Sequence, residues 1–474
     1  MGRNANEEIS LSALGSSARF SKSLTGNNPA TAQLPEPRIE NSQNKILHSL
    51  VRQLDESQWW PEDKLKQGQL QQLRNLLAYS IVYSSFYKER LKNIDPGKLS
   101  LEQFREIPVL TRSDLQSSRA TIDCSQVPES HGKSTEVMTS GSTAKPVSLL
   151  GTGLTSMIWN AINLREHLWH DRVIAATTAA IRWRPDDVGM APDGVTFDDW
   201  GMPVNQFYKT SAAYYLNSSS NISDQLQWLE QLKPSYLMTH PSNLQGLVEE
   251  SKRQNSDLSF VKQFRTVGES VSDAQRQIVE DEFGQELVDF YSSQELGYIA
   301  LQCPQQSHYH VQAESLIVEV LREDGSPCAP FESGRLVITS LRNYATPLIR
   351  YEVGDYGEIG EPCACGRSLP VLNKINGRVR NMLQLPNGER HWPNFGFRKI
   401  MDITELRQFQ VVQHSLETME LKLAVVGSVE PQQEQSIKEI LQQHIGHPFE
   451  IEISYHEELQ RNANGKFEDF VSLI

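Results

Sequence analysis

Residues 137–146 read Val-Met-Thr-Ser-Gly-Ser-Thr-Ala-Lys-Pro, a run of small hydroxylated residues and glycine that ends in Lys145 and a proline. Glycine and small side chains let backbone N–H groups approach a polyphosphate closely, and a lysine adds a point charge. The G-x-x-x-x-G-K-[ST] spacing of a Walker A loop is absent. The residues alone leave two interpretations open: a phosphate-binding loop, or an ordinary turn rich in serine, threonine and glycine.

Around this run, from about residue 133 to 370, short apolar segments alternate with helical patterns. Alternating strands and helices predict an α/β architecture. Before it, apolar residues at helical spacing predict an amphipathic helix that starts near residue 66. Residues 1–43 are rich in serine, asparagine and proline, and we expect a flexible tail there.

The last hundred residues have a pattern of their own. An Asn-Gly pair at 387–388 predicts a hairpin, followed by a helix near 395–402 and two strands across 407–426. A proline start and a glycine stop predict a helix across 431–445, and a strand follows at 449–455. We therefore expect a large domain at 44–376 and a small α+β domain at 377–474.

Composition excludes several classes of protein. The 474 residues contain 45 Lys and Arg against 59 Asp and Glu, for a formal net charge of −14. This balance disfavours nucleic acid or an anionic membrane as a partner over the whole surface. Five cysteines are too few and of the wrong parity for a disulfide framework, and no apolar run is long enough for a signal peptide or a membrane span. We expect a soluble cytoplasmic protein, monomeric or homodimeric.

Four further stretches accompany the run at 139–146: Tyr-Ser-Ser-Gln-Glu-Leu-Gly at 291–297, Pro-Leu-Ile-Arg-Tyr-Glu-Val-Gly-Asp at 347–355, Gly-Arg at 377–378 and Asn-Gly-Lys-Phe at 464–467. In type and order they resemble the motifs of adenylate-forming enzymes, the superfamily of acyl-CoA synthetases, adenylation domains and luciferase. Segments 85–89, 104–110, 267–270 and 365–367 are similar to its phenylacetate–CoA ligase branch, which includes coenzyme F390 synthetase-like and capsule-type homologues.

The resemblance implies a fold and a reaction. The fold is a large multi-layer N-terminal adenylation domain with a small mobile C-terminal domain. In the reaction, a carboxylic acid attacks MgATP to give an acyl-adenylate and pyrophosphate, and a thiol, most naturally that of CoA, then displaces AMP. An amine or a carrier-protein thiol is the alternative acceptor. A non-catalytic nucleotide-binding homologue is a third hypothesis, which the joint presence of Lys145, Glu295, Asp355 and Lys466 disfavours.

The resemblance also implies roles for single residues. The implied catalytic residues are Lys145, Glu295 and Lys466, and the implied ATP- and AMP-binding residues are Ser140, Gly141, Ser142, Thr143, Gly268, Glu269, Ser270, Tyr291, Ser292, Gln294, Asp355 and Arg378. Glu295 would hold Mg²⁺, a hard cation that prefers oxygen ligands. Tyr291 would stack on adenine, and Asp355 would accept both ribose hydroxyls. Lys466 would bridge the substrate carboxylate and the α-phosphate.

The chain departs from the family pattern at four positions. Ala144 replaces a usual glycine, and Gln294 replaces the expected Ser or Thr. Arg380 stands where an aspartate usually forms the hinge, and Asp469 stands where a basic residue is common. The first two bear on the adenylation rate and on metal geometry. The last two bear on CoA binding and leave room for another acceptor.

The cysteines and two histidines raise the question of a metal site. Cys363 and Cys365 are separated by one residue, whereas zinc knuckles commonly use two to four. The spacing alone is weak evidence for zinc and is also consistent with two buried thiols and surface histidines. Some members of the resembled branch carry zinc in these segments, which implies a structural Zn²⁺ on Cys303, His310, Cys363 and Cys365, with His308 in reserve.

For the acyl group, the resemblance implies that His240 borders the substrate carboxylate. The segment that follows reads as a helix start, for which we expect Ser242 as the N-cap. Trp159, Trp169 and Trp183 fall in the region that often shapes the acyl pocket, although packing in the core is the commoner role of a tryptophan.

Overall fold

The computed structural model describes residues 37–39, 41–138, 147–184, 186–378, 382–391, 393, 395–459 and 467–474. Several predicted site residues lie outside this part of the chain: Ser140, Gly141, Ser142, Thr143, Ala144, Lys145, Arg380 and Lys466. The N-terminal tail also lies almost entirely outside it.

Twelve of the described strands form one large sheet in the order β11-β12-β13-β14-β10-β9-β8-β7-β6-β3-β5-β4. Strands β3, β5, β6, β7 and β8 pair in parallel, and the remaining neighbours are antiparallel. The strands are β3 (Thr178–Arg182), β4 (Val195–Phe197), β5 (Ala213–Asn217), β6 (Tyr236–Thr239), β7 (Gln263–Thr266), β8 (Glu286–Ser293), β9 (Gly297–Gln302), β10 (Tyr309–Val311), β11 (Leu316–Leu321), β12 (Ser333–Ser340), β13 (Tyr351–Ile359) and β14 (Val371–Arg378).

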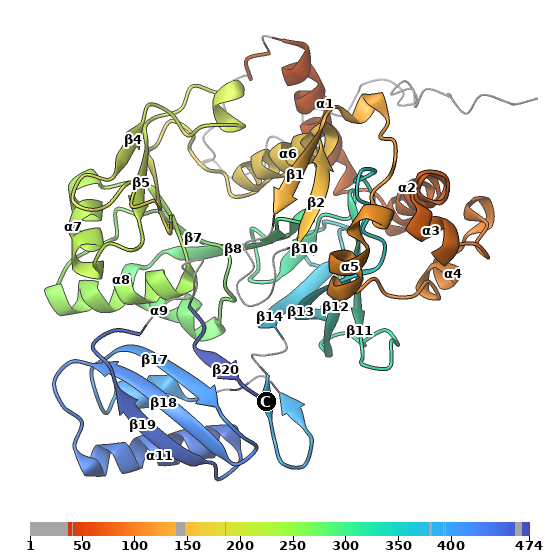
Figure 1. Cartoon of the computed structure of the whole chain (residues 1–474). Coiled ribbons are helices and arrows are strands. Elements are labelled where there is room, and N and C mark those ends of the chain that lie inside the picture. Colours follow the sequence, from red (N-terminus) through yellow and green to blue (C-terminus); the bar gives the residue numbers. More distant parts are fainter. Residues whose placement is uncertain are drawn as a thin grey trace, which may run out of the picture.

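Helices cover this sheet. One group, at the antiparallel end, comprises α2 (Glu62–Tyr83), α3 (Ser85–Arg90), α4 (Leu101–Arg105) and α5 (Arg112–Ile122). A second group lies against the parallel strands and comprises α7 (Ile222–Leu232), α8 (Pro241–Gln254) and α9 (Asp273–Phe283). On the opposite face of those strands lies α6 (Gly153–Trp169), with α1 (Ser42–Ser57) packed against it. Figure 1 shows α7–α9 and α2–α5 on opposite flanks of the molecule.

Side-chain alternation in the parallel strands decides what each face contacts. Leu237 and Phe264 are fully buried among the apolar residues of α7–α9. Their neighbours Met238 and Arg265 pair across β6 and β7 and therefore point to the other face, toward α6. The sheet thus has an apolar face and a face that also carries charge.

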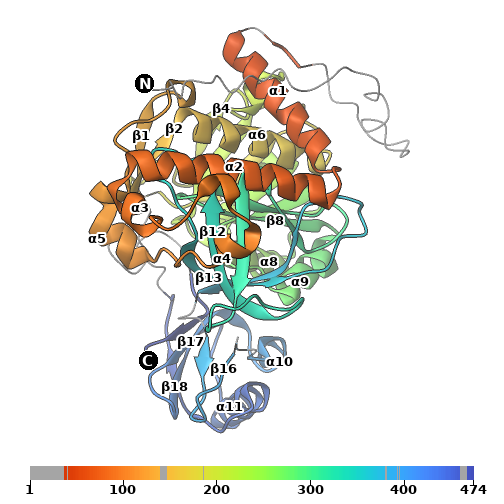
Figure 2. The same ribbon diagram turned by 90° about the vertical axis from the view of Figure 1, so that its right-hand side faces the viewer.

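The last part of the chain forms a second core. A four-stranded sheet in the order β19-β18-β17-β20 packs on α11 (Pro431–Ile445). Its strands are β17 (Leu406–Gln413), β18 (Thr418–Val425), β19 (Glu450–Tyr455) and β20 (Phe470–Ser472), and the hairpin β15 (Leu383–Gln384) and β16 (Arg390–His391) and helix α10 (Phe397–Met401) precede them. This unit lies below the main body in Figures 1 and 2.

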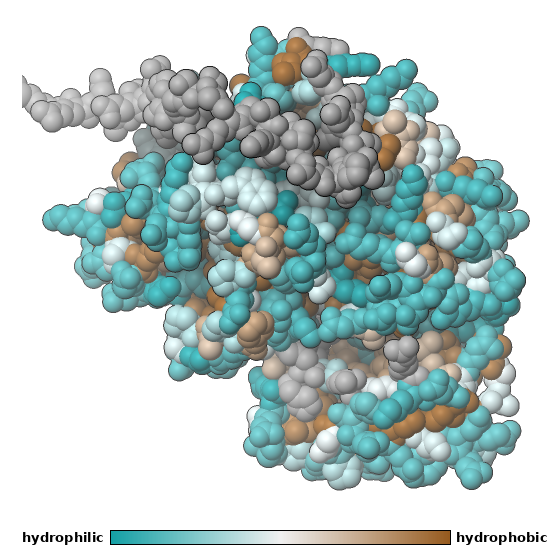
Figure 3. Space-filling view, turned by 180° about the vertical axis from the view of Figure 1, so that it is seen from behind, coloured by the Kyte–Doolittle hydropathy of each residue, from teal (hydrophilic) through white to brown (hydrophobic). Residues whose placement is uncertain are grey.

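The expected elements agree closely with these. The predicted hairpin, the helix at 431–445 and the strand at 449–455 are confirmed, and the amphipathic helix begins four residues before its predicted start. The α/β class is confirmed. The face in Figure 3 is mainly hydrophilic, with hydrophobic residues in small groups. None of the described helices is both long and apolar enough to cross a membrane.

Candidate active site

A continuous cavity of about 2090 Å³ lies between the large sheet and the small C-terminal unit. Side chains from α6, the parallel strands, β13 and β14 line it, and Phe397, Phe409 and Phe467 of the small unit also line it. It also takes in the predicted site residues His240, Gly268, Glu269, Ser270, Tyr291, Ser292, Gln294, Glu295, Asp355 and Arg378. The fold thus brings together His240 and every predicted nucleotide-binding residue that the structure describes.

Asp355 sits in a ready-made polar frame at one end of the cavity. The Tyr291 hydroxyl donates to its Oδ2 over 2.6 Å, and Arg378, its cross-strand neighbour on β14, brings Nε to 3.5 Å from Oδ1. Burial, with the nearby Asp355 charge, raises the pKa of Tyr291 well above its ordinary value, so Tyr291 stays a donor. The frame fixes a carboxylate that can accept hydrogen bonds from a bound diol.

Glu269 joins the large domain to the small unit. Its Oε2 accepts from the backbone N–H of Ser242 over 3.0 Å, and its Oε1 accepts from the Ser242 hydroxyl over 3.1 Å. Oε1 also accepts from the backbone N–H of Phe467 over 2.9 Å. Phe467 directly follows Lys466, so this carboxylate anchors the residue next to the predicted catalytic lysine.

Glu295 lies in the turn between β8 and β9, where its carboxylate is only 12% exposed. Arg112, the first residue of α5, brings Nη1 to 3.8 Å from Oε1. Sequence reasoning missed Arg112, although it lies two residues beyond the family-like segment at 104–110. A guanidinium beside the predicted magnesium ligand can also attract phosphate, which makes Arg112 a candidate for the ATP site.

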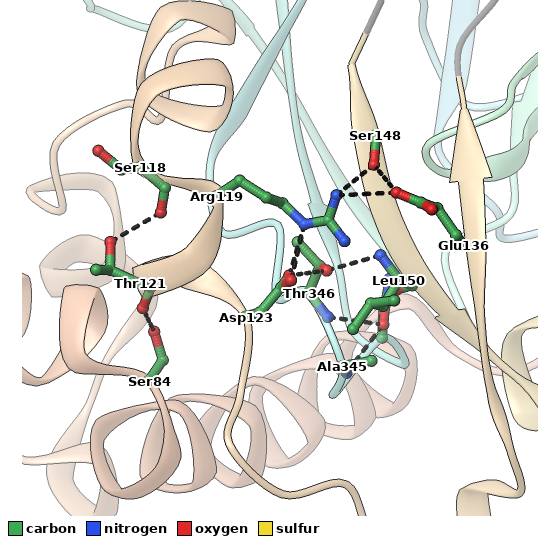
Figure 4. A network of polar contacts seen from close by, with 11 residues as sticks. Ser84, Ser118, Arg119, Thr121, Asp123, Glu136, Ser148, Leu150, Ala345 and Thr346 are labelled. Carbon is green, nitrogen blue, oxygen red and sulfur yellow. Dashed lines mark hydrogen bonds and ion pairs between the residues drawn. The ribbon is translucent and has the colours of Figure 1, made fainter.

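A polar network supports the hairpin that flanks residues 139–146. Strands β1 (Ser134–Met138) and β2 (Ser148–Thr152) form this hairpin. Arg119 of α5 donates to the Ser148 hydroxyl over 2.5 Å and to both oxygens of Asp123 over 2.9 and 2.8 Å. Thr346 accepts from the Leu150 N–H over 2.9 Å and donates to Asp123 (Figure 4). Arg119 and Ser148 also contact Glu136 of β1, so the network ties both strands of the hairpin to α5 and to the segment before Arg350.

His240 is 4% exposed and lines the cavity at the start of α8. Its Nδ1 lies 2.8 Å from the Val267 carbonyl, which can only accept, so Nδ1 carries the proton and the ring is fixed in orientation. The expectation of Ser242 as N-cap is wrong. The helix begins at Pro241 with His240 as the N-cap, because proline is favoured at the first helical position.

The three tryptophans divide between two roles. Trp159 and Trp183 line the cavity. Trp169 is buried instead and packs edge-to-face on His310, with ring centroids 5.7 Å apart.

The predicted metal ligands converge in the structure. The ligand atoms of Cys303, His310, Cys363 and Cys365 all lie within 4.8 Å of one another. The Cys303 and Cys363 sulfurs are 3.7 Å apart, and the Cys365 sulfur lies 3.4 Å from Nε2 of His310. Tetrahedral zinc, with Zn–S bonds of ~2.3 Å and Zn–N bonds of ~2.0 Å, spaces two sulfurs by about 3.8 Å and a sulfur and a nitrogen by about 3.5 Å. These two distances fit such an ion.

The surroundings of the four ligands suit a metal as well. Nδ1 of His310 lies 3.3 Å from the Leu369 carbonyl, which leaves Nε2 as the ligand atom. Burial lowers the pKa of His310 to about 4, so the ring is neutral near pH 7. Burial opposes ionisation of Cys365, but hydrogen bonds from the Arg367 backbone and from Cys363 outweigh it and lower its pKa. His308, the reserve ligand, is absent from the cluster.

Comparison with known proteins agrees with this geometry. Residues 397–472 match the model of the CapK C-terminal domain. The phenylacetate-coenzyme A ligase of Thermus thermophilus is 26% identical over 384 residues, which are 77% of this chain and 82% of that protein. The corresponding ligase of Escherichia coli is 24% identical over 336 residues, 68% of this chain and 72% of its own.

Solved structures show the same fold. A 2-hydroxyisobutyryl-CoA ligase in its postadenylation state, bound to an acyl-AMP, superposes with a TM-score of 0.67 at 18% identity and covers 85% of this chain and 88% of its own. The same ligase with CoA, in its thioesterification state, gives 0.56 at 18% identity, with 87% and 91% covered.

Fold, cavity and sequence similarity together define an adenylate-forming ligase with a large N-terminal domain and a small C-terminal domain. Within that class, the chain lies on the phenylacetate–CoA ligase-like branch, which the match to the CapK C-terminal domain also supports.

Proposed function

We propose that this enzyme activates a carboxylic acid with MgATP to an acyl-adenylate and then transfers the acyl group to the thiol of CoA. One observation carries the proposal: a single cavity holds the diol-accepting frame around Asp355, the half-buried Glu295 and the Glu269 anchor of Phe467. The named activity of the relatives, phenylacetate–CoA ligation, supports CoA as the acceptor.

The chemistry follows from charge. Attack of a carboxylate on the α-phosphate brings two anions together, so cations and donors must offset the charge of the transition state. In our assignment Ser140, Ser142, Thr143 and Lys145 hold the β- and γ-phosphates, and Glu295 binds Mg²⁺. Lys466 contacts the reacting oxygens, and Asp355 holds the ribose.

The acceptor admits an alternative. Arg380 and Asp469 depart from the pattern expected for CoA binding, so an amine or a carrier-protein thiol stays as the second candidate. We place the enzyme in the cytoplasm, as a monomer or homodimer, on the sequence grounds given above.

We also propose that Cys303, His310, Cys363 and Cys365 bind one structural Zn²⁺. The convergence of the four side chains and the match of one S–S and one S–N distance to those around tetrahedral zinc support this assignment, and four protein ligands leave no open position for catalysis. The ion would join the turn after β9 to the segment after β13.

Acid-dependent exchange of pyrophosphate into ATP tests the proposed function, with phenylacetate included in the panel of acids. Failure of exchange with every acid would refute adenylation. Consumption of CoA, compared with trapping of the acyl-adenylate by hydroxylamine, separates CoA from the other acceptors.

Lys466→Ala should abolish exchange and leave ATP binding largely intact, whereas Lys98→Ala, at a surface lysine whose side chain is 87% exposed, should change neither. Near-normal exchange by the Lys466 variant would show that the lysine is wrongly assigned.

A further inference from the structure

Two walls enclose the inner part of the cavity: helix α6 on one side, and strands β3, β6 and β7 on the other. Trp159, Asn163 and His167 follow one another at intervals of four residues on α6, so they share one face of that helix, and all three line the cavity. Opposite them, Ala180, Met238 and Arg265 stand side by side in register on β3, β6 and β7, and they also line it. An acyl group that lies between α6 and these strands therefore contacts the guanidinium of Arg265.

Arg265 has to share its acidic partner with a second arginine. Its Nη2 donates to Oε2 of Glu166 over 2.6 Å. Arg172 already binds the same carboxylate with two hydrogen bonds, Nη1 to Oε2 over 2.5 Å and Nη2 to Oε1 over 2.6 Å. The side chains of Glu166 and Arg172 are each 1% exposed, and that of Arg265 is 8% exposed. Water therefore contributes little to balancing their charge.

The charges of Glu166, Arg172 and Arg265 do not cancel. Burial alone would raise the pKa of Glu166, but the adjacent Arg172 and Arg265 hold it well below its ordinary value, so Glu166 carries one negative charge against two positive ones. His167 does not change the balance, because burial and then Arg265 lower its pKa well below the ordinary value and keep it neutral. One positive charge is left over at the wall of the cavity.

Donors at the same wall are not used up by the protein. Among the side-chain nitrogens of Arg265, only Nη2 has a hydrogen-bond partner in the described part of the chain, and Nε is buried without one. Nη1 of Arg172 lies 3.2 Å from Nδ1 of His167. Because a guanidinium only donates hydrogen bonds, Nδ1 accepts, and the proton of the neutral ring is on Nε2. The next acid on this part of the sheet, Asp289, points to the opposite face, where Thr266 and Tyr309 donate to it.

We propose that the acid activated by this enzyme carries a second anionic group, a carboxylate at the end away from the reacting one, and that Arg265 binds it. A buried cation with half of its counter-charge missing is costly, and a ligand carboxylate both neutralises it and accepts its unused N–H groups. The inference rests on the proposed adenylation and names its substrate class.

Matched acids test the inference. Pyrophosphate exchange is measured with straight-chain monoacids and diacids of equal length from four to eight carbons, and with phenylacetate against 4-carboxyphenylacetate. In at least one pair we expect kcat/KM to favour the diacid by about 10- to 100-fold, the value of a hydrogen bond to a charged group.

Arg265→Gln should remove the preference for the diacid and raise activity on the monoacid, because it removes the positive charge from the cavity wall. The local structure should persist, since the amide can still donate to Glu166, which keeps both bonds from Arg172. Arg265→Lys keeps the charge and should keep the order of preference. Arg253→Gln, at a surface arginine paired with Glu250 outside the cavity, is the control and should change nothing. Unchanged ATP binding by each variant verifies its fold.

The outcomes separate the two proposals. A monoacid preference in every pair, or a diacid preference that survives in Arg265→Gln, overturns this inference alone. A preference for ω-hydroxy acids over diacids likewise overturns the anionic assignment. Exchange with no acid overturns the proposed function and this inference with it.

Discussion

Removal of the proposed zinc should loosen a defined corner of the large domain. Cys303 follows β9, His310 lies in β10, and Cys363 and Cys365 lie in the segment between β13 and β14, so the ion would join three parts of the antiparallel sheet. The same segment also contacts the residues that directly follow α1, because Arg367 lies 4.9 Å from the centre of the Trp59 ring and the Ser368 N–H donates to the Gln58 carbonyl over 2.8 Å.

The size of the effect can be worked out. Cys363→Ser/Cys365→Ser removes two of the four ligands and leaves Cys303 and His310, which cannot complete a tetrahedron. If free zinc exceeds the dissociation constant a thousandfold, binding stabilises the folded state by about 4 kcal/mol. A domain of more than 300 residues shifts its Tm by less per kcal/mol than the ~2–4 °C of smaller ones, so we expect a loss of about 4 to 8 °C.

Two measurements decide the matter. Elemental analysis of the purified protein should give about one zinc per chain, and the double variant should have none. The Tm of the wild type should fall on chelation, whereas that of the double variant should not respond. Cys328→Ser is the matched control, because Cys328 is a buried cysteine outside the cluster and should leave both zinc content and chelator response unchanged. A zinc-free wild type with a Tm indifferent to chelator would refute the site.

Three further predictions address the remainder of the cavity and the core. Asp355→Asn should raise the KM for ATP in pyrophosphate exchange by about 10- to 100-fold, since it removes a charged acceptor; an unchanged KM would reject the ribose role. Arg119→Met should raise the KM for ATP by about 3- to 10-fold with little effect on the KM for the acid, because it releases the β1–β2 hairpin at Ser148; equal effects on both would contradict this. Burial raises the pKa of Asp289 to about 6, so the folded state binds the extra proton between about pH 4 and 6 and the wild type loses stability as pH rises through that window. Asp289→Asn should lack that loss, so urea unfolding should show its stability relative to wild type rising by up to about 3 kcal/mol from pH 4 to 7; a constant difference would show that the buried carboxyl has an ordinary pKa.

The sequence predicted the elements of the small domain well because their signals are local. An Asn-Gly pair, a proline at a helix start and a glycine at its end act within a few residues, and the structure has the predicted elements there. The proposed metal cluster was harder to predict, because its sequence spacing is unusual and only the fold brings Cys303 close to Cys363, 60 residues further along the chain.

Arg112, Arg119 and Arg265 escaped prediction for another reason. An arginine on a helix or strand gives no local sign of its partner, and each of these meets its acid or hydroxyl through tertiary packing. Arg265 occupies a strand position that alternation alone would assign to an apolar residue, since every residue of β7 is buried. The charged Arg265 in a buried strand was the one signal that the sequence offered. Its pairing with Glu166 of α6 became visible only in the structure.

Glu269 shows how one side chain of the cavity can link the start of α8 to the small C-terminal unit. A carboxylate only accepts hydrogen bonds, so one side chain can hold both the start of α8, through Ser242, and the backbone of Phe467. Ser242 lies two residues after His240, the residue predicted to border the substrate carboxylate. Any rotation of the small domain has to break the Phe467 bond while the Ser242 bonds remain, because only Phe467 belongs to that domain. After such a rotation Glu269 would keep its bonds to Ser242 at the start of α8, and the lone pair of Oε1 that accepts from Phe467 would be open to another donor.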